Sequence, residues 1–530
     1  MRFEMKSSLP VLMSALLILA APFVRADVKP SKIFGDHMVL QRDMPVPVWG
    51  KADPGEKVTV SFAGQKKSVV AGGNGKWRLT LKPLKASAKG SEMTISGKNT
   101  VKFKDVLVGE VWVCCGQSNM ELGVGAIGDL MKLMPEAKKM PIHSFVIKDH
   151  ITLEPSDKCE GEWRAEPPSS AVAFGFAYFL NKKIDVPIGI IQTSWGSAYI
   201  EGWMPIELTK QLPHFKKWMD RVRSDKDIMK AVSLVVEQFE KHGRIDSKYY
   251  DDPKKDEAFK KTLAHKPGYT DNANVFARTQ PNLLYNAMLH PVIPYAVRGM
   301  VWYQGEANAE NWKDATQYAE SLQLWTKALR KIWKNENFHM LGVMLPGFGK
   351  MMGGSPKPKE MEYPGNITWA YMRESQMKLL SLPHTGIANT VDLGDARNIH
   401  PHDKKPLCER LALIAARYVY GQKIVAVGPI FSKYKVKGNK LYIKFTHAEG
   451  LKTSDGEPPK GFWLTDKEHK EWFPAKARII GDIVELTSDK VPNPAACRYA
   501  FAAKPTLNLV NGAGLPAYPF RTDTWNPYDK

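Results

Sequence analysis

Apolar and polar residues alternate in short segments near the start of the chain. Residues 58–62 and 77–81 have the period of two that a half-buried strand requires, and a glycine-rich turn at 72–75 lies between them. Short strands separated by such turns predict a small β-sandwich-like module over residues 27–105.

The same alternation returns towards the end of the chain. Residues 435–445 and 478–487 each contain a central Gly-Asn or Gly-Asp dipeptide, which is typical of a tight β-hairpin turn. We therefore predict a second β-sandwich-like module over residues 423–530.

Between these two modules, residues 106–422 have a different pattern. Runs that are apolar at nearly every position alternate with segments in which apolar residues recur at helical spacing. The runs are residues 106–113, 188–191, 297–303, 340–345 and 385–391, and the clearest helical series is Tyr318, Leu322, Trp325, Leu329 and Ile332. Strands covered on both faces that alternate with helices predict an α/β fold with a doubly wound parallel sheet. The highly charged residues 206–275 are predicted to form a helical insertion in this domain.

Residues 1–26 have the composition of a secretory signal peptide. Arg2 and Lys6 give a positive start, residues 9–21 are mostly apolar, and Val24-Arg25-Ala26 has the small-x-small pattern of a cleavage site. The apolar run is shorter than the roughly 20 residues of a membrane-spanning helix, and no later segment is apolar enough to span a membrane. We therefore expect a secreted or periplasmic protein that has no membrane span after cleavage.

Charge and cysteine content exclude several classes of function. The 530 residues carry a formal net charge of +20, but the lysines are spread along the chain without a basic arm. This distribution favours a solvated surface over nucleic-acid binding. The five cysteines do not have zinc-site spacing, and their odd number leaves at least one thiol without an internal disulfide. Since phosphate-binding and His-Glu-x-x-His motifs are also missing, we expect no metal and no cofactor. The sequence carries no signal for an oligomeric state.

Two polar residues follow apolar runs at places where a parallel sheet brings them together. Ser118 comes soon after the run at 106–113, and His400 lies between the run at 385–391 and a helical segment. Ligands of open α/β sheets bind at the carboxyl ends of the strands, which favours Ser118 as a nucleophile and His400 as its base. Taken alone, Ser118 also fits a helix N-cap, and His400 also fits a surface loop. The motif G-x-S-x-G does not occur, which disfavours the α/β-hydrolase fold.

Several ordered sequence blocks resemble those of the sialate O-acetylesterase family within the SGNH hydrolases. The resemblance covers nearly the whole chain after residue 26. The blocks are Gly116-Gln-Ser-Asn-Met120, Thr193-Ser-Trp-Gly196 with Glu201 and Trp203, Trp302-Tyr-Gln-Gly-Glu306 with Asn308, Ile399-His-Pro401 with Lys404, and Asp36-His-Met-Val-Leu-Gln41.

The resemblance implies a serine carboxylic-ester hydrolase that removes O-acetyl groups from a carbohydrate through an acyl-serine intermediate. Ser118 is then the nucleophile and His400 the base. The implied oxyanion donors are the backbone N–H groups of Ser118 and Gly196 and a side-chain amide, with Gln304 as the first choice and Asn308 as the second. Other residues of the same blocks complete the implied oxyanion and substrate-binding set: Gln117, Asn119 and Glu306.

The group that orients His400 departs from the family's pattern. Many SGNH enzymes have Asp three residues before the histidine, where this chain has Arg397, and relatives often have Asp two residues before it, where this chain has Asn398. An Asn side chain can orient an imidazole but cannot stabilise imidazolium by charge. The remaining alternatives are that Asp392 or Asp395 orients the imidazole, that the enzyme uses a Ser–His dyad, or that it is slow.

Two other functions fit the same blocks. An acetylxylan esterase that acts on plant or algal polysaccharide would use the same site. A catalytically impaired carbohydrate-binding relative is also consistent with Asn398. In each case the expected partner is an acetylated carbohydrate.

Overall fold

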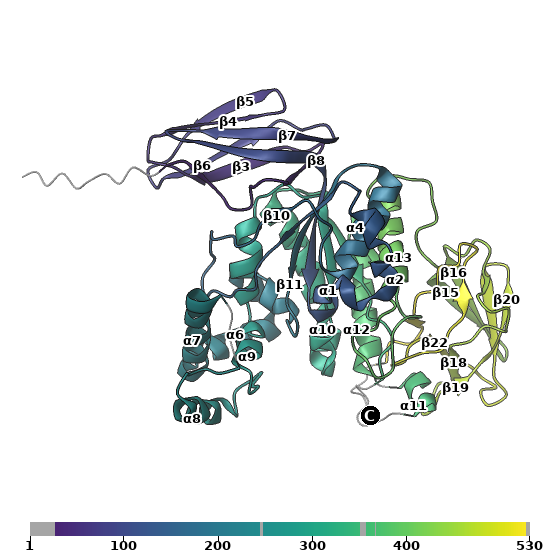
Figure 1. Ribbon diagram of the computed structural model, residues 1–530. Helices are drawn as coiled ribbons and strands as arrows, with labels where there is room; N and C mark the ends of the chain where they lie inside the picture. Colours follow the sequence, from purple (N-terminus) through teal and green to yellow (C-terminus); the bar gives the residue numbers. More distant parts are fainter. Residues whose placement is uncertain (1–26, 244–246, 350–356, 366, 526–530) are drawn as a thin grey trace, which may run out of the picture.

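The computed structural model describes residues 27–243, 247–349, 357–365 and 367–525. Figure 1 shows an α/β part with one β module above it and a second β module at its side. The predicted signal peptide, residues 1–26, lies outside the described residues.

The N-terminal β module consists of two sheets. One has the order β1-β3-β6, and in the other β4 pairs with β5 and β7, and β7 pairs with the first half of β8. The strands are β1 (Lys29–Pro30), β2 (Val39–Gln41), β3 (Val46–Lys51), β4 (Lys57–Phe62), β5 (Gln65–Val70), β6 (Lys76–Leu81), β7 (Ser87–Ser96) and β8 (Thr100–Gly116). Buried and exposed residues alternate along β4 and β6, as their sequences predict. The pattern missed β5 because this strand buries none of its residues.

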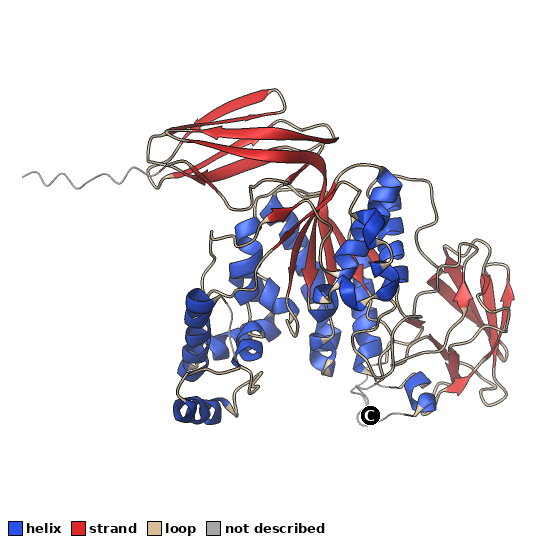
Figure 2. Ribbon diagram, viewed as in Figure 1, coloured by secondary structure: helices blue, strands red, loops and turns tan. Residues whose placement is uncertain are grey.

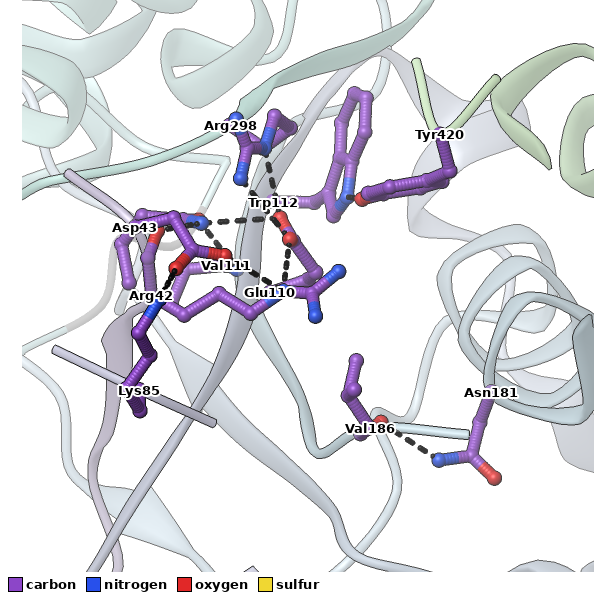
Figure 3. A network of polar contacts seen from close by, with 11 residues as sticks. Arg42, Asp43, Lys85, Glu110, Val111, Trp112, Asn181, Val186, Arg298 and Tyr420 are labelled. Carbon is purple, nitrogen blue, oxygen red and sulfur yellow. Dashed lines mark hydrogen bonds and ion pairs between the residues drawn. The ribbon is translucent and has the colours of Figure 1, made fainter. Parts of the chain in front are cut away.

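Strand β8 joins the N-terminal module to the central sheet. Its first residues alternate between exposed and half-buried, whereas every residue from Val106 to Gly116 is buried. The domain boundary predicted after residue 105 therefore falls inside this strand. Glu110 on β8 is fully buried and accepts hydrogen bonds from Arg42 Nε (2.6 Å) and Arg298 Nε (2.8 Å) (Figure 3). Burial alone raises the pKa of Glu110, but the hydrogen bonds from Arg298, Arg42 and Gln41 and the charge of Arg298 outweigh it and lower that pKa. This cluster ties residue 42 of the module to the segment before β12.

The central sheet confirms the predicted doubly wound α/β fold. Its order is β10-β9-β11-β8-β12-β13-β14, and all adjacent pairs are parallel except β10–β9. The strands beside β8 are β9 (Ile142–Val146), β10 (Trp163–Arg164), β11 (Ile188–Ser194), β12 (Gly299–Tyr303), β13 (His339–Val343) and β14 (Thr385–Ala388). Apolar runs predicted all of these strands except β9, which contains His143 and Ser144, and β10, which has only two residues.

Helices cover the sheet on both sides (Figure 2). Helix α4 packs against α13 over β9, β11, β13 and β14, and α10 packs against α12. The predicted helical series from Tyr318 to Leu329 lies on the buried side of α10. The bounds are α1 (Ser118–Glu121), α2 (Gly128–Met131), α3 (Met134–Ala137), α4 (Ala171–Ile184), α10 (Trp312–Trp333), α11 (Pro358–Glu362), α12 (Thr368–Met377) and α13 (Lys404–Tyr418).

The charged segment predicted as an insertion contains helices between β11 and β12. They are α5 (Ile206–Thr209), α6 (Pro213–Ser224), α7 (Lys226–His242), α8 (Pro253–Leu263) and α9 (Ala273–Arg278). Helices α6 and α7 are amphipathic. Each buries its apolar face and exposes its polar face, so the charged residues lie on the solvent side.

The C-terminal β module contains both predicted hairpins. Its sheets have the orders β15-β16-β21-β20, β19-β18-β22-β24 and β17-β23. The strands are β15 (Ile430–Lys437), β16 (Lys440–Thr446), β17 (Lys452–Thr453), β18 (Phe462–Thr465), β19 (Phe473–Pro474), β20 (Lys476–Ile480), β21 (Ile483–Thr487), β22 (Ala496–Tyr499), β23 (Leu509–Val510) and β24 (Phe520–Arg521). The fully buried Arg373 of α12 fixes this module in place, because it donates to the carbonyl groups of Leu345, Pro346, Ala502 and Ala503.

The five cysteines are all buried free thiols. In the part of the chain that the structure describes, no helix has the length and apolar character needed to cross a bilayer.

Candidate active site

Ser118 and His400 meet at the carboxyl end of the central sheet. Ser118 is the first residue of α1, which follows β8, and His400 lies in the loop between β14 and α13. Although 282 positions separate them, Ser118 Oγ lies 2.7 Å from His400 Nε2, and both residues are half-buried. In Figure 1, α1 lies at the end of the sheet that is remote from the N-terminal module.

Two glycines allow the backbone to approach closely around Ser118. Gly116 has φ +154°, and a Cβ atom at this position would lie 2.0 Å from the carbonyl oxygen of Tyr303 on β12. Gly196 follows β11, and a Cβ atom there would lie 3.3 Å from Ser118 Cβ. A side chain at residue 116 would separate β8 from β12, and one at residue 196 would crowd the nucleophile.

The backbone N–H of Gly196 is occupied by a carboxylate of this chain. It donates a 2.6 Å hydrogen bond to Glu121 Oε2, and the Glu121 side chain is exposed. Because Glu121 and Ser118 are three residues apart on α1, they share one face of the helix. An ester oxygen bound at Gly196 N–H would have to take the place of this carboxylate oxygen.

The side chains of the three predicted orienting residues bind other groups and not the imidazole of His400. Asp392 forms a bidentate ion pair with Arg410, with both N–O distances 2.7 Å. Asp395 Oδ1 accepts the backbone N–H groups of residues 397 and 398. Asn398 Oδ1 accepts the backbone N–H of His400 at 2.9 Å. Among the described residues, none donates to or accepts from His400 Nδ1, so the geometry fits a Ser–His dyad.

The charge that acts on the pKa of His400 is that of a cation, Lys404. Burial, and then the charge of Lys404, lower the pKa of His400. A neutral imidazole is the form that can accept a proton, so this environment keeps His400 in its basic form at lower pH than usual.

The two side-chain amides predicted as the third oxyanion donor, Gln304 and Asn308, have partners inside the protein. Gln304 is fully buried, and its Nε2 lies within hydrogen-bond distance of Gln117 Oε1, the Ala198 carbonyl and Asn308 Oδ1. Asn308 Nδ2 donates to Glu201 Oε2 at 3.1 Å. Both amides are therefore bound inside the protein, because the end of β12 directs this loop into the core.

Two further predicted substrate-binding residues are buried as well. Asn119 is fully buried and Glu306 is 3% exposed. Asn119 Nδ2 donates to Glu306 Oε1 at 2.5 Å, and burial raises the pKa of Glu306. Gln117 is also buried, and its Oε1 accepts from Gln304 Nε2, from Gly305 N and from Ala307 N, the start of η5 (Ala307–Ala309). No acceptor for Gln117 Nε2 is found among the described residues.

Sequence reasoning missed two charged residues whose charges interact with Glu121, namely Arg278 and Asp149. The guanidinium of Arg278 lies 5.4 Å from the ring centroid of Trp195, the residue before Gly196. Asp149 has an exposed side chain. Protein atoms around its carboxyl group nevertheless displace part of the water, and this desolvation, together with the charge of Glu121, raises the pKa of Asp149 to about 7. No family block includes Arg278 or Asp149, so only the fold brings them near the site.

Several known proteins are similar to this chain in sequence or in structure. The family model described as "Carbohydrate esterase, sialic acid-specific acetylesterase" matches residues 272–412, a range that includes His400. The crystal structure of a carbohydrate acetylesterase from Xanthomonas citri is 30% identical, covers 94% of this chain and 100% of its own, and has a TM-score of 0.76. The chain belongs to the sialic acid-specific acetylesterase family of carbohydrate esterases.

Curated relatives extend the likeness over both β modules. The sialate O-acetylesterase of Mus musculus is 25% identical over 96% of this chain and 97% of its own length. The enzyme of the same name from Homo sapiens is 25% identical over 92% of this chain and 90% of its own. As a member of the sialic acid-specific acetylesterase family, the protein is an esterase, a carboxylic-ester hydrolase.

Proposed function

We propose that the protein removes O-acetyl groups from a sialic acid, with Ser118 as nucleophile and His400 as general base. The observation that supports this assignment is the 2.7 Å contact between Ser118 Oγ and His400 Nε2 beside the backbone of Gly196. The names of the relatives, several of which are sialate O-acetylesterases, support sialic acid as the substrate.

In the acylation half-reaction, Ser118 Oγ attacks the acetyl carbonyl carbon while His400 Nε2 takes the hydroxyl proton. The carbonyl π electrons move to the oxygen and form a tetrahedral oxyanion. When this intermediate collapses, the bond to the sugar oxygen breaks, and Nε2 returns the proton to that oxygen. The free sugar hydroxyl leaves, and acetyl-Ser118 remains.

In the deacylation half-reaction, water attacks acetyl-Ser118 and gives a proton to His400 Nε2. The second tetrahedral intermediate releases acetate and restores Ser118 Oγ–H. Since Asp392, Asp395 and Asn398 are engaged elsewhere, the imidazolium of both steps forms without a carboxylate behind it. The enzyme then operates as a Ser–His dyad.

The oxyanion would be stabilised by the backbone N–H groups of Ser118 and Gly196. The first has no acceptor among the described residues, and the second becomes available when Glu121 leaves it. Gln117 Nε2 is the remaining amide donor of the predicted set, because three donors fix the orientation of its Oε1. Removing one donor from an oxyanion site typically lowers kcat about 10²- to 10³-fold.

The function is tested by measuring acetate release from O-acetylated sialosides and acetylated xylan, with p-nitrophenyl acetate as a general ester. Wild type should hydrolyse the sialosides with the higher kcat/KM. Ser118→Ala and His400→Ala should each lose about 10⁴-fold or more in kcat. A preference for xylan would overturn the substrate assignment. Absence of turnover in the wild type would instead support a carbohydrate-binding relative that has lost catalysis.

We also propose that the protein is exported, to the periplasm or beyond, on the basis of the signal-like residues 1–26. The mature protein should begin at Asp27, which N-terminal sequencing of the exported form would show. A mature chain that begins at Met1 would contradict export by cleavage.

A further inference from the structure

A buried lysine lies behind the proposed Ser–His pair. Lys404 is the first residue of α13 and is only 1% exposed. Its Nζ donates a 2.6 Å hydrogen bond to Asn119 Oδ1 and lies 5.0 Å from the ring centroid of Tyr303. Among the described residues, no carboxylate is within ion-pair distance of Nζ. A lysine so deeply buried is rare, because removing an ammonium group from water is unfavourable unless nearby groups compensate.

Asn119 connects this lysine to a buried carboxylate. The Oδ1 atom of Asn119 accepts from Lys404, and the Nδ2 atom donates to Glu306 Oε1 at 2.5 Å and to the carbonyl of Ile399 at 2.9 Å. One amide thereby joins the nucleophile helix to three other segments: the histidine loop, the start of α13 and the loop after β12. Glu306 Oε2 is buried and has no hydrogen-bond partner among the described residues, so the carboxylate depends on Asn119 and on the nearby lysine.

Stability alone does not account for such an arrangement. Apolar residues of similar volume often stabilise a core as well as a buried charged cluster does. The sequence positions are informative here, because Asn119 directly follows Ser118 and Ile399 directly precedes His400. The hydrogen bonds of Asn119 therefore fix the distance between the nucleophile and its base.

The same lysine also sets the charge around His400. The triad of serine proteases has a carboxylate behind the histidine, which stabilises imidazolium. In this protein, Lys404 is the charged group that acts on the pKa of His400, and it lowers that pKa together with burial. Burial lowers the pKa of Lys404 itself to about 8, while the charges of Glu306 and Asp403 oppose this change. Lys404 thus remains largely cationic at neutral pH.

We propose that Lys404 is a positioning residue of the esterase, which holds the Ser118 helix against the His400 loop through Asn119 and keeps a cation beside the imidazole. This inference rests on the roles proposed above for Ser118 and His400.

The test is the pH profile of kcat/KM for p-nitrophenyl acetate in Lys404→Met and in a matched control, Lys405→Met. Lys405 is the next residue on α13, is 40% exposed and pairs with Glu409 at 2.6 Å. The acid limb is the fall of kcat/KM at low pH, where His400 becomes protonated. Loss of the buried cation should move this limb to higher pH by about one unit, because His400 then protonates more easily. The rate at the plateau should fall about 10-fold or more. Lys405→Met should leave the limb in place.

A second variant keeps the test decisive if Lys404→Met does not fold. Lys404→Gln removes the positive charge but keeps a side-chain amide that can still donate to Asn119 Oδ1, so the acid limb should move to higher pH as in Lys404→Met. Such a shift is not expected from a network that only holds the fold together, since that role would lower the rate without moving the limb.

The inference is overturned if the limb of Lys404→Gln, and that of Lys404→Met where it folds, stay at the wild-type position. Ser118→Ala is measured in the same series. If Ser118→Ala keeps the wild-type rate, the proposed function itself fails. If Ser118→Ala is inactive and the limbs do not move, only the role of Lys404 is wrong.

Discussion

Asn119 and Glu121 lie on the same short helix as Ser118, and their surroundings are opposite. Asn119 is fully buried and makes hydrogen bonds to Glu306, Ile399 and Lys404. Glu121 is exposed, and its hydrogen bond goes to the backbone N–H of Gly196. The buried side of α1 fixes the nucleophile, whereas the exposed side holds an oxyanion donor that a substrate can take over.

The difference in burial decides how strongly each side is held. A buried polar group that loses its partner suffers the full loss of hydration, and a buried charge suffers more. An exposed carboxylate regains its hydrogen bonds from water, so releasing it requires little free energy. The helix can thus keep Ser118 in place while Glu121 exchanges with an ester oxygen.

The largest effect is expected from Asn119→Leu, which removes the amide and keeps about the same volume. Lys404 and Glu306 would then be buried without their shared partner, a situation that typically destabilises a protein by about 3–5 kcal/mol. We expect a lower Tm and a fall in kcat of about 10²-fold, because a small displacement of a catalytic group has an effect of this size. Thermal unfolding and steady-state kinetics measure the two quantities.

Glu121→Leu is the matched control on the same helix. It makes a similar substitution two residues further on, at an exposed position, and should leave Tm close to that of the wild type. If both variants lose stability equally, or if Asn119→Leu keeps the wild-type kcat, the contrast between the two sides of the helix is wrong.

An intermediate effect is expected from Glu121→Ala. Gly196 N–H would no longer carry a carboxylate of the chain, so an ester would not have to displace it. We expect kcat/KM to rise about 3- to 10-fold, mainly through KM, and acetate to become a stronger competitive inhibitor because it can use the same donor. Steady-state kinetics at several acetate concentrations measure both changes. A fall in kcat/KM would mean that Glu121 assists the reaction.

How well the sequence predicts the site depends on how local the deciding geometry is. Ser118 and His400 could be placed because each follows an apolar run, and parallel strands bring their carboxyl ends to one edge. The orientation of the Gln304 and Asn308 side chains could not be predicted, because it depends on how the loop after β12 packs against Gln117 and Ala198.

The positions of Asn119 and Glu121 illustrate the same limit within one helical turn. Residues two apart on a helix point about 200° from each other, so one must face inward when the other faces out. The sequence does not say which, because Asn119 and Glu121 are both polar. The doubly wound sheet, in contrast, could be predicted, since runs such as 188–191 and 297–303 are apolar throughout.

The smallest effect is expected from Asp149→Asn, which changes charge on the exposed side alone. The pKa of Asp149 is raised to about 7 by desolvation and by the charge of Glu121, so the carboxyl group is neutral below pH 7 and negative above it. An anionic ester should therefore bind less well as the pH rises from 6 to 8, by about 2- to 4-fold. The ratio of kcat/KM for an O-acetyl sialoside to that for p-nitrophenyl acetate isolates this effect, because changes in His400 or Lys404 act on both substrates. The ratio should fall with pH in the wild type and stay constant in Asp149→Asn; an equal fall in the variant would place the titrating group elsewhere.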